Sequence, residues 1–86
     1  MGMRRFHKPV RIQIGRIDRD RIVCGTEDAA KILLRAWPST HNEKRQAAMR
    51  ACLEVLKGQK PPSVARRAFI EAAQEARVLL DEDTRA

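Results

Sequence analysis

The sequence predicts a small α+β domain in which a β-hairpin packs against three α-helices, in the order ββααα. In two short segments near the amino terminus, apolar and polar residues alternate with the period of a half-buried strand. From Thr26 onward, apolar residues recur instead at steps of three and four, as in an amphipathic helix. Glycine and proline residues divide this helical part into three segments. A chain of 86 residues then forms one domain with a modest core.

The two strands of the hairpin are expected at residues 10–14 and 21–24. No Asn-Gly or Asp-Gly pair lies between them to fix the register of a tight turn. A hairpin alone is marginally stable in water, so this one must pack on the helices or pair with another sheet edge. Residues 1–9 are expected to form a flexible, basic segment ahead of it.

The first helix is expected at residues 26–36. Thr26 can cap its amino terminus, and two acidic residues in the first turn complement the helix dipole. Pro38 ends the helix, because proline disfavours the α conformation of the residue before it. The inner side of the helix is expected to carry Ala29, Ala30, Leu33, Leu34 and Trp37.

The second and third helices are expected at residues 43–57 and 64–80, followed by a charged tail over residues 81–86. Gly58 suits the left-handed position just past a helix end, and Ser63 can cap the third helix. Small residues in the inner stripes let two helix backbones approach closely. The stripes consist of Ala48, Cys52, Val55, Ala65, Ala68, Phe69, Ala72, Ala73, Ala76 and Leu79. The single domain therefore spans residues 10–80, with Trp37, Cys52 and Phe69 in its structural core.

The basic charge of the chain is concentrated in its first 25 residues. These carry seven Arg and Lys against two Asp, whereas the remaining residues carry eleven against nine acidic residues. A two-stranded ribbon can enter the major groove of DNA, where Arg can read guanine. Nucleic-acid binding is therefore an alternative function, and its residues would be Arg4, Arg5, Lys8, Arg11, Arg16, Arg19 and Arg21. Because two aspartates interrupt this basic segment, a solvated loop is the simpler interpretation.

The metal-ligating and nucleophilic side chains form no recognisable motif. His7, Cys24, His41 and Cys52 are dispersed along the chain, whereas zinc ligands usually come in close pairs. They are better interpreted as two buried thiols and two exposed histidines. No base is placed beside either thiol, and no glycine-rich phosphate loop occurs. We therefore expect no catalytic residue, no metal site and no cofactor.

Two arginines occupy an unusual position in the third helix. Arg66 and Arg67 lie in its first turn, near the positive end of the helix dipole, where cations are mildly unfavourable. This placement requires compensation from an acidic partner, from a carboxylate at residues 81–83 of another chain, or from solvent.

Several segments together resemble a known family. They are the Pro9-Val10 strand, TEDAAKILLRAWP, AAMRACLEVLKG and ARRAFIEAAQEA. From about residue 9 to residue 78 the chain is similar to the domain of unknown function 982 family. These are short bacterial proteins, found mostly in rhizobium-type alphaproteobacteria. Trp37, Pro38, Cys52, Arg66 and Phe69 are among the matching positions. The resemblance implies a fold and no established activity, catalytic residue or ligand.

These observations favour a non-catalytic interaction module that self-associates or binds another protein. Self-association would use either the hairpin edge or an alanine-lined helix face. Two hairpins paired across a twofold axis would form a four-stranded sheet and cover one exposed edge in each subunit. No apolar run approaches the roughly 18 residues of a membrane span, and no secretory signal is present, so we expect no membrane partner and a cytoplasmic location. A thiol-dependent enzyme built on Cys24 or Cys52 is the remaining alternative.

Overall fold

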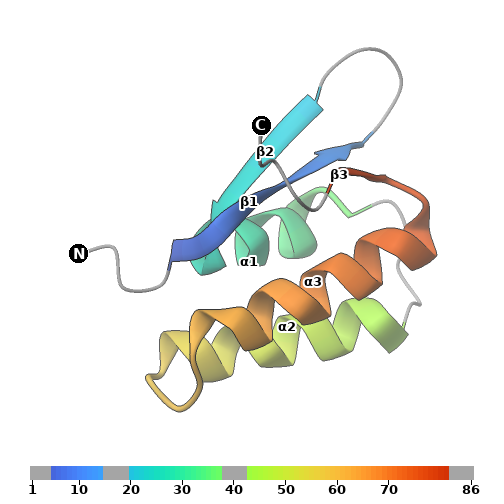
Figure 1. Ribbon diagram of the computed structural model, residues 1–86. Coiled ribbons are helices and arrows are strands. Elements are labelled where there is room, and N and C mark those ends of the chain that lie inside the picture. Colours follow the sequence, from blue (N-terminus) through green and yellow to red (C-terminus); the bar gives the residue numbers. More distant parts are fainter. Residues whose placement is uncertain (1–4, 15–19, 38–42, 82–86) are drawn as a thin grey trace.

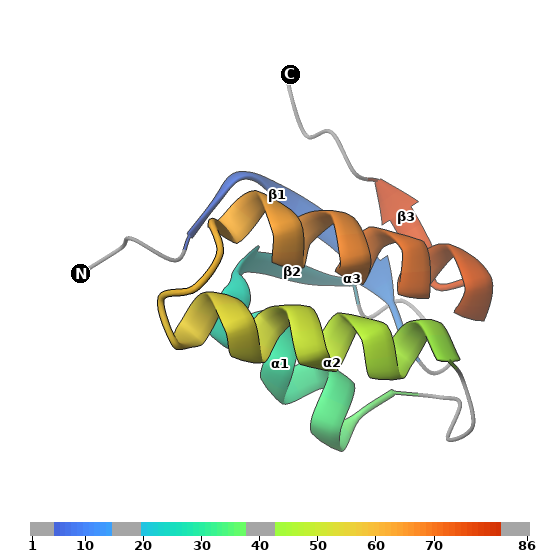
Figure 2. The ribbon, with the colours of Figure 1, turned by 90° about the horizontal axis from the view of Figure 1, so that it is seen from below.

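The computed structural model describes residues 5–14, 20–37 and 43–81 of the chain. It contains a three-stranded antiparallel sheet of strand order β2-β1-β3 and three helices. The elements are β1 (Arg5–Gln13), β2 (Asp20–Gly25), α1 (Thr26–Arg35), α2 (Glu43–Leu56), α3 (Pro62–Ala76) and β3 (Leu79–Asp81). The helices lie on one face of the sheet, and α2 and α3 run side by side (Figures 1 and 2). The predicted α+β class, with an amino-terminal hairpin on three helices, is confirmed.

Strand β1 begins at Arg5, five residues earlier than expected. Arg5 pairs with Gly25 and Val10 pairs with Val23, so β1 advances five residues while β2 advances two. The surplus residues form an irregularity that contains Pro9, which fits a bulge because proline cannot donate to the strand ladder. Phe6 is buried within this stretch and anchors the start of the strand in the core.

The third helix ends at Ala76, and the expected helix up to residue 80 is wrong at this end. Arg77 adopts the left-handed conformation with φ 62° and closes the helix. The Val78 amide then donates to the Ala73 carbonyl at 3.0 Å, and the chain turns back toward β1. Leu79 pairs with Ile12 in the sheet. The missed element is therefore β3, which turns the hairpin into a three-stranded sheet.

Two predicted helix caps are also wrong. Helix α1 begins at Thr26 itself, with Gly25 at the N-cap position, and α3 begins at Pro62, with Pro61 at the N-cap position. Neither N-cap residue makes a side-chain hydrogen bond to its helix. Proline suits the first helical position because its missing N–H would have no partner there. Ser63 consequently lies inside the first turn, where it lines a cavity described below.

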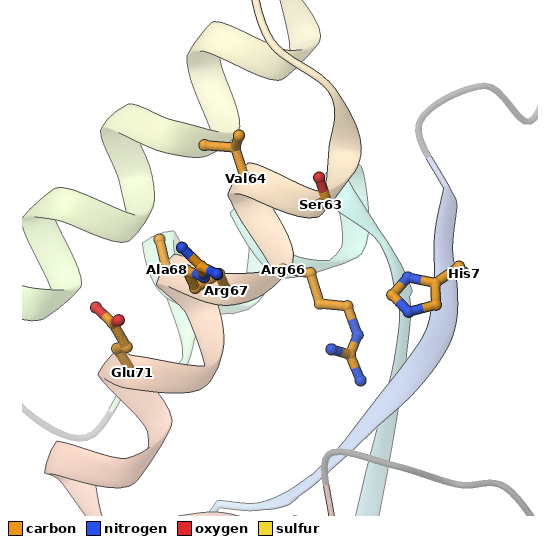
Figure 3. A pocket seen from close by; sticks show the side chains of 7 residues that line it. All are labelled: His7, Ser63, Val64, Arg66, Arg67, Ala68 and Glu71. Carbon is orange, nitrogen blue, oxygen red and sulfur yellow. The ribbon is translucent and has the colours of Figure 1, made fainter.

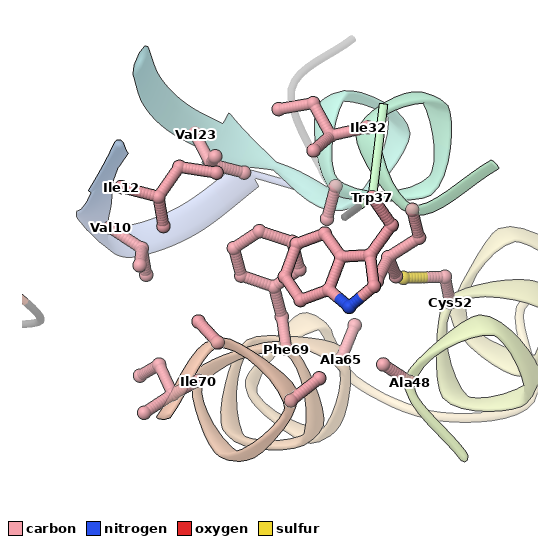
Figure 4. Close-up of a cluster of buried hydrophobic side chains, with 14 of the residues drawn as sticks. Val10, Ile12, Val23, Ile32, Trp37, Ala48, Cys52, Ala65, Phe69 and Ile70 are labelled. Atoms are coloured by element: carbon pink, nitrogen blue, oxygen red, sulfur yellow. The ribbon is translucent and has the colours of Figure 1, made fainter. Parts of the chain in front are cut away.

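The core is centred on Phe69 and Trp37, which come from α3 and from the end of the α1 segment (Figure 4). Their ring centroids are 5.5 Å apart, with a tilt of 59° between the planes. This tilted geometry is favourable for an aromatic pair. Cys52 of α2 is fully buried beside them. The Trp37 Nε1 atom is buried without a hydrogen-bond partner in the described residues, so the ring is held by packing.

On α1 the buried stripe is displaced from the expected one. Ile32 and Leu33 face the core, whereas Leu34 is 61% exposed, so its predicted inner position is wrong. The carboxyl end of this helix is held from α2, because Arg45 Nε donates to the Leu33 carbonyl at 2.9 Å. This carbonyl belongs to the last turn of α1, whose acceptors have no partner within the helix.

The alanine stripes of α2 and α3 are buried within the chain. Their buried members are Ala48, Ala51, Ala65, Ala72 and Ala73, which belong to the two helices that pack side by side. The small side chains allow this close approach. An alanine-lined face is therefore not left free for self-association in the described helices.

Candidate functional site

Strand β2 is an outer strand of the sheet, and its outer edge adjoins a groove. Among the described strands β2 pairs only with β1. The groove has a volume of about 450 Å³ and is lined by Arg21, Ile22, Asp28, Lys31 and Ile32. We call it the β2 groove. Ile22 is 56% exposed, although the sequence pattern placed it in a strand that packs on the core.

The charges at the two ends of β2 differ. Arg21 is exposed near the start of the strand. Glu27 and Asp28, which are also exposed, lie in the first turn of α1, directly after the strand ends. Arg21 follows Asp20 in the sequence, so β2 carries one exposed cation near its start and is followed by two exposed carboxylates just beyond its end.

The two thiols occupy different environments. Val23 is fully buried, so alternation along β2 directs the neighbouring Cys24 toward the other face of the sheet. Cys24 is exposed there, which corrects the interpretation of both cysteines as buried. Cys52 lies in α2, and burial raises the pKa of its thiol from 9.0 to about 11. A thiol of this kind stays protonated near neutral pH, and the thiolate is the nucleophilic form.

The predicted nucleic-acid residues do not share one surface on the hairpin. Arg11 pairs with Ile22, whereas Arg21 pairs with Ile12 at the next position of the register. Opposite residues share a face and successive positions alternate, so Arg11 and Arg21 face opposite sides of the sheet. Arg5 is exposed and Lys8 is half-buried, while Arg4, Arg16 and Arg19 lie outside the described residues.

The three candidate metal ligands that the structure describes are not brought together either. His7 is exposed on β1, the two cysteines lie on β2 and α2, and His41 lies outside the described residues. Within residues 5–14, 20–37 and 43–81, no group of three or more His, Cys, Asp or Glu side chains could hold a metal ion. Glu71 on α3 forms an exposed ion pair with Lys44 of α2, at 3.7 Å.

A cavity that the sequence pattern did not reveal runs along the first half of α3 and is bordered by His7 of β1 (Figure 3). Its volume is about 510 Å³, and it is lined by His7, Ser63, Val64, Arg66, Arg67, Ala68 and Glu71. We call it the β1–α3 cavity. Arg66 reaches from α3 toward β1, and its Nε donates to the Lys8 carbonyl at 2.9 Å. This bond crosses 58 positions of sequence, so local spacing could not have signalled the site. Because α3 begins at Pro62, Arg66 and Arg67 lie in its second turn, and their predicted place in the first turn is wrong.

No helix in the described part of the chain is long and apolar enough to cross a membrane. Comparison with curated proteins and with solved structures gave no match. A family model matches residues 8–80, which include most of β1, all of β2 and the three helices, and the start of β3. The chain therefore belongs to the DUF982 family, whose description is "Protein of unknown function".

Proposed function

We propose that this protein is a non-catalytic interaction module that self-associates by pairing β2 with β2 of a second copy. The observation that carries the proposal is the outer edge of β2, a six-residue strand with an exposed Ile22 and an adjoining groove. Backbone groups on an open strand edge are a template for pairing with another strand. The other outer strand, β3, has three residues and offers a shorter edge.

A twofold axis perpendicular to the sheet would relate the two copies. Such an axis makes the β2 strands antiparallel and keeps the helices of both copies on the same side of a continuous six-stranded sheet. Residues opposite one another must then point to the same face, so the axis passes through a residue position, and Ile22 and Val23 are the two central positions of β2. Ile22 lies opposite its equivalent in the first register and opposite Cys24 of the second copy in the second.

The charges around β2 favour this antiparallel arrangement. Arg21 of one copy would lie opposite Val23 or Gly25 of the second copy, near the start of α1. There it approaches the first-turn carboxylates Glu27 and Asp28. A parallel arrangement would instead place each Arg21 beside its equivalent. Opposite charges brought together in this way contribute to orientation and specificity.

The non-catalytic part of the proposal is supported by the two thiols. Cys52 is buried with a raised thiol pKa, and Cys24 is exposed on a different element. Alkylation under native conditions tests the rival thiol-dependent enzyme. We expect Cys52 to react slowly in the folded protein and rapidly after unfolding, whereas rapid alkylation of Cys52 in the folded protein would support the rival.

Light scattering coupled to size-exclusion chromatography tests the self-association. We expect the wild-type protein to have the mass of a dimer and the Ile22→Lys variant to have the mass of a monomer. Lysine on an edge strand opposes pairing with another strand, and in the register through Ile22 it would place two like charges opposite one another. Leu53→Lys is the matched control, since Leu53 is 49% exposed on α2 and lies outside the β2 groove. A monomeric wild type would overturn the proposal, and so would a dimer broken by Leu53→Lys but not by Ile22→Lys.

A further inference from the structure

The β1–α3 cavity has the side chains of an anion-binding site. Two guanidinium groups, from Arg66 and Arg67, share its lining with the imidazole of His7 and the hydroxyl of Ser63. Guanidinium groups bind phosphate oxygens with several N–H donors at once, and imidazole and hydroxyl groups can each donate one further hydrogen bond. The lining therefore combines positive charge with donors from two separate elements, β1 and α3 (Figure 3).

The positive charge of this cavity is not neutralised by its own helix. Helices α1 and α2 have acidic residues in their first turns, whereas α3 has none. Arg67 forms no ion pair with any side chain in the described part of the chain. The lining carboxylate, Glu71, is paired with Lys44. A ligand with negative charge would supply a counter-ion for Arg67 at the surface of this cavity.

The hydrogen bond from Arg66 gives the site a fixed geometry. Its Nε bonds to the Lys8 carbonyl of β1, which lies in the irregular stretch of that strand. This bond places the guanidinium charge between the two elements that form the cavity. His7 is the residue next to Lys8, so the same contact sets the distance between the imidazole and α3.

The size of the cavity indicates more than a single phosphate. Its volume of about 510 Å³ is in the range of small-molecule sites. Val64 and Ala68 supply apolar surface beside the charged groups. We infer that the β1–α3 cavity binds the phosphate monoester of a small molecule. The phosphate would contact Arg66, Arg67 and His7, and the carbon skeleton would contact Val64 and Ala68.

Isothermal titration calorimetry with inorganic phosphate and with glycerol 3-phosphate, at constant ionic strength, tests the inference. We expect both probes to bind, with glycerol 3-phosphate tighter by at least about threefold, because its carbon skeleton gains apolar contacts. The Arg67→Gln and His7→Gln variants should each weaken binding by about tenfold, as expected for the loss of one charge-assisted hydrogen bond. Both residues are exposed, and unchanged thermal unfolding would show that the variants fold.

The matched control is Arg50→Gln, which removes an exposed arginine from α2, outside the cavity. It should leave both affinities unchanged. Absence of binding by the wild type would overturn the inference, as would equal losses in Arg50→Gln and Arg67→Gln. Equal affinities for the two probes would overturn the assignment of Val64 and Ala68 to a carbon skeleton. A single-stranded oligonucleotide serves as a third probe. If it binds the wild type and loses affinity in Arg67→Gln, while glycerol 3-phosphate does not bind, the phosphate-monoester inference is overturned in favour of nucleic acid.

Discussion

At the residue scale, Phe69 contributes most to the core. It is the largest fully buried side chain, and its ring packs against Trp37. We expect Phe69→Ala to lower the free energy of unfolding by about 3–5 kcal/mol, from lost burial and the cavity that remains. Urea denaturation measures this loss. Leu34→Ala is the control, because Leu34 is exposed, and it should cost no more than about 0.5 kcal/mol. Equal losses in the two variants would contradict the assigned core.

The buried thiol of Cys52 predicts a dependence of stability on pH. Burial raises the pKa of this thiol to about 11 in the folded chain, against 9.0 for an ordinary cysteine. Between these values the unfolded chain releases the proton and the folded chain retains it, so stability falls as the pH rises. Below pH 9 both states hold the proton, and the stabilising contribution is fully present.

Comparison with Cys52→Ala isolates this effect from the other groups that titrate at high pH. Denaturation at pH values below 9 and between 9 and 11 should show a steeper loss for the wild type than for the variant. Parallel losses in the two proteins would show that the Cys52 thiol has an ordinary pKa in the folded state.

At the scale of elements, the helices are joined to their neighbours by arginine side chains that donate to backbone carbonyls. Arg45 joins α2 to the last turn of α1, and Arg66 joins α3 to β1. We expect Arg45→Met, which keeps most of the apolar stem, to lower the free energy of unfolding by about 1 kcal/mol. The control is Arg50→Met on the exposed side of the same helix, with an expected change within about 0.5 kcal/mol. Thermal or urea unfolding measures the two losses. Equal losses in Arg45→Met and Arg50→Met would contradict the role assigned to Arg45.

The sequence predicted most elements because their periodicity is strong, and it failed where a local pattern fits two structures. Leu79 continues the helical spacing of α3, yet it belongs to β3. The helix is ended by Arg77 in a left-handed conformation. Residues other than glycine rarely adopt this conformation, so an arginine at this position does not predict the end of a helix. By contrast, Gly58 follows α2 with φ 82°, as predicted, because glycine is the usual residue at that position.

The candidate sites were harder to predict because each depends on contacts between distant segments. The β1–α3 cavity joins His7 to Arg66 and Arg67, and no spacing in the chain relates them. The only sequence signal was the adjacent pair Arg66 and Arg67, which the pattern had placed one turn too close to the start of the helix. For β2, the pattern predicted the strand but could not show that it would be the outer strand.

At the scale of the whole molecule, the sheet has one face covered by helices and one outer strand long enough to pair with another chain (Figure 2). Ile22 and Leu80 are about half exposed on the outer strands β2 and β3. The core of an 86-residue chain is modest, so pairing of two sheets would add stability that the single copy lacks.

Cross-linking of Cys24 tests the central claim, that β2 pairs with β2 of a second copy. In the two registers that keep the helices on one side, the Cys24 Cα atoms of the two copies would be about 8–14 Å apart, from strand spacing and rise. Cys24 is exposed and Cys52 is buried, so a bis-maleimide of matching length reacts selectively at the strand. We expect a covalent dimer that Ile22→Lys abolishes and Leu53→Lys leaves intact. A protein that remains uncross-linked at Cys24, while light scattering shows a dimer, would contradict it.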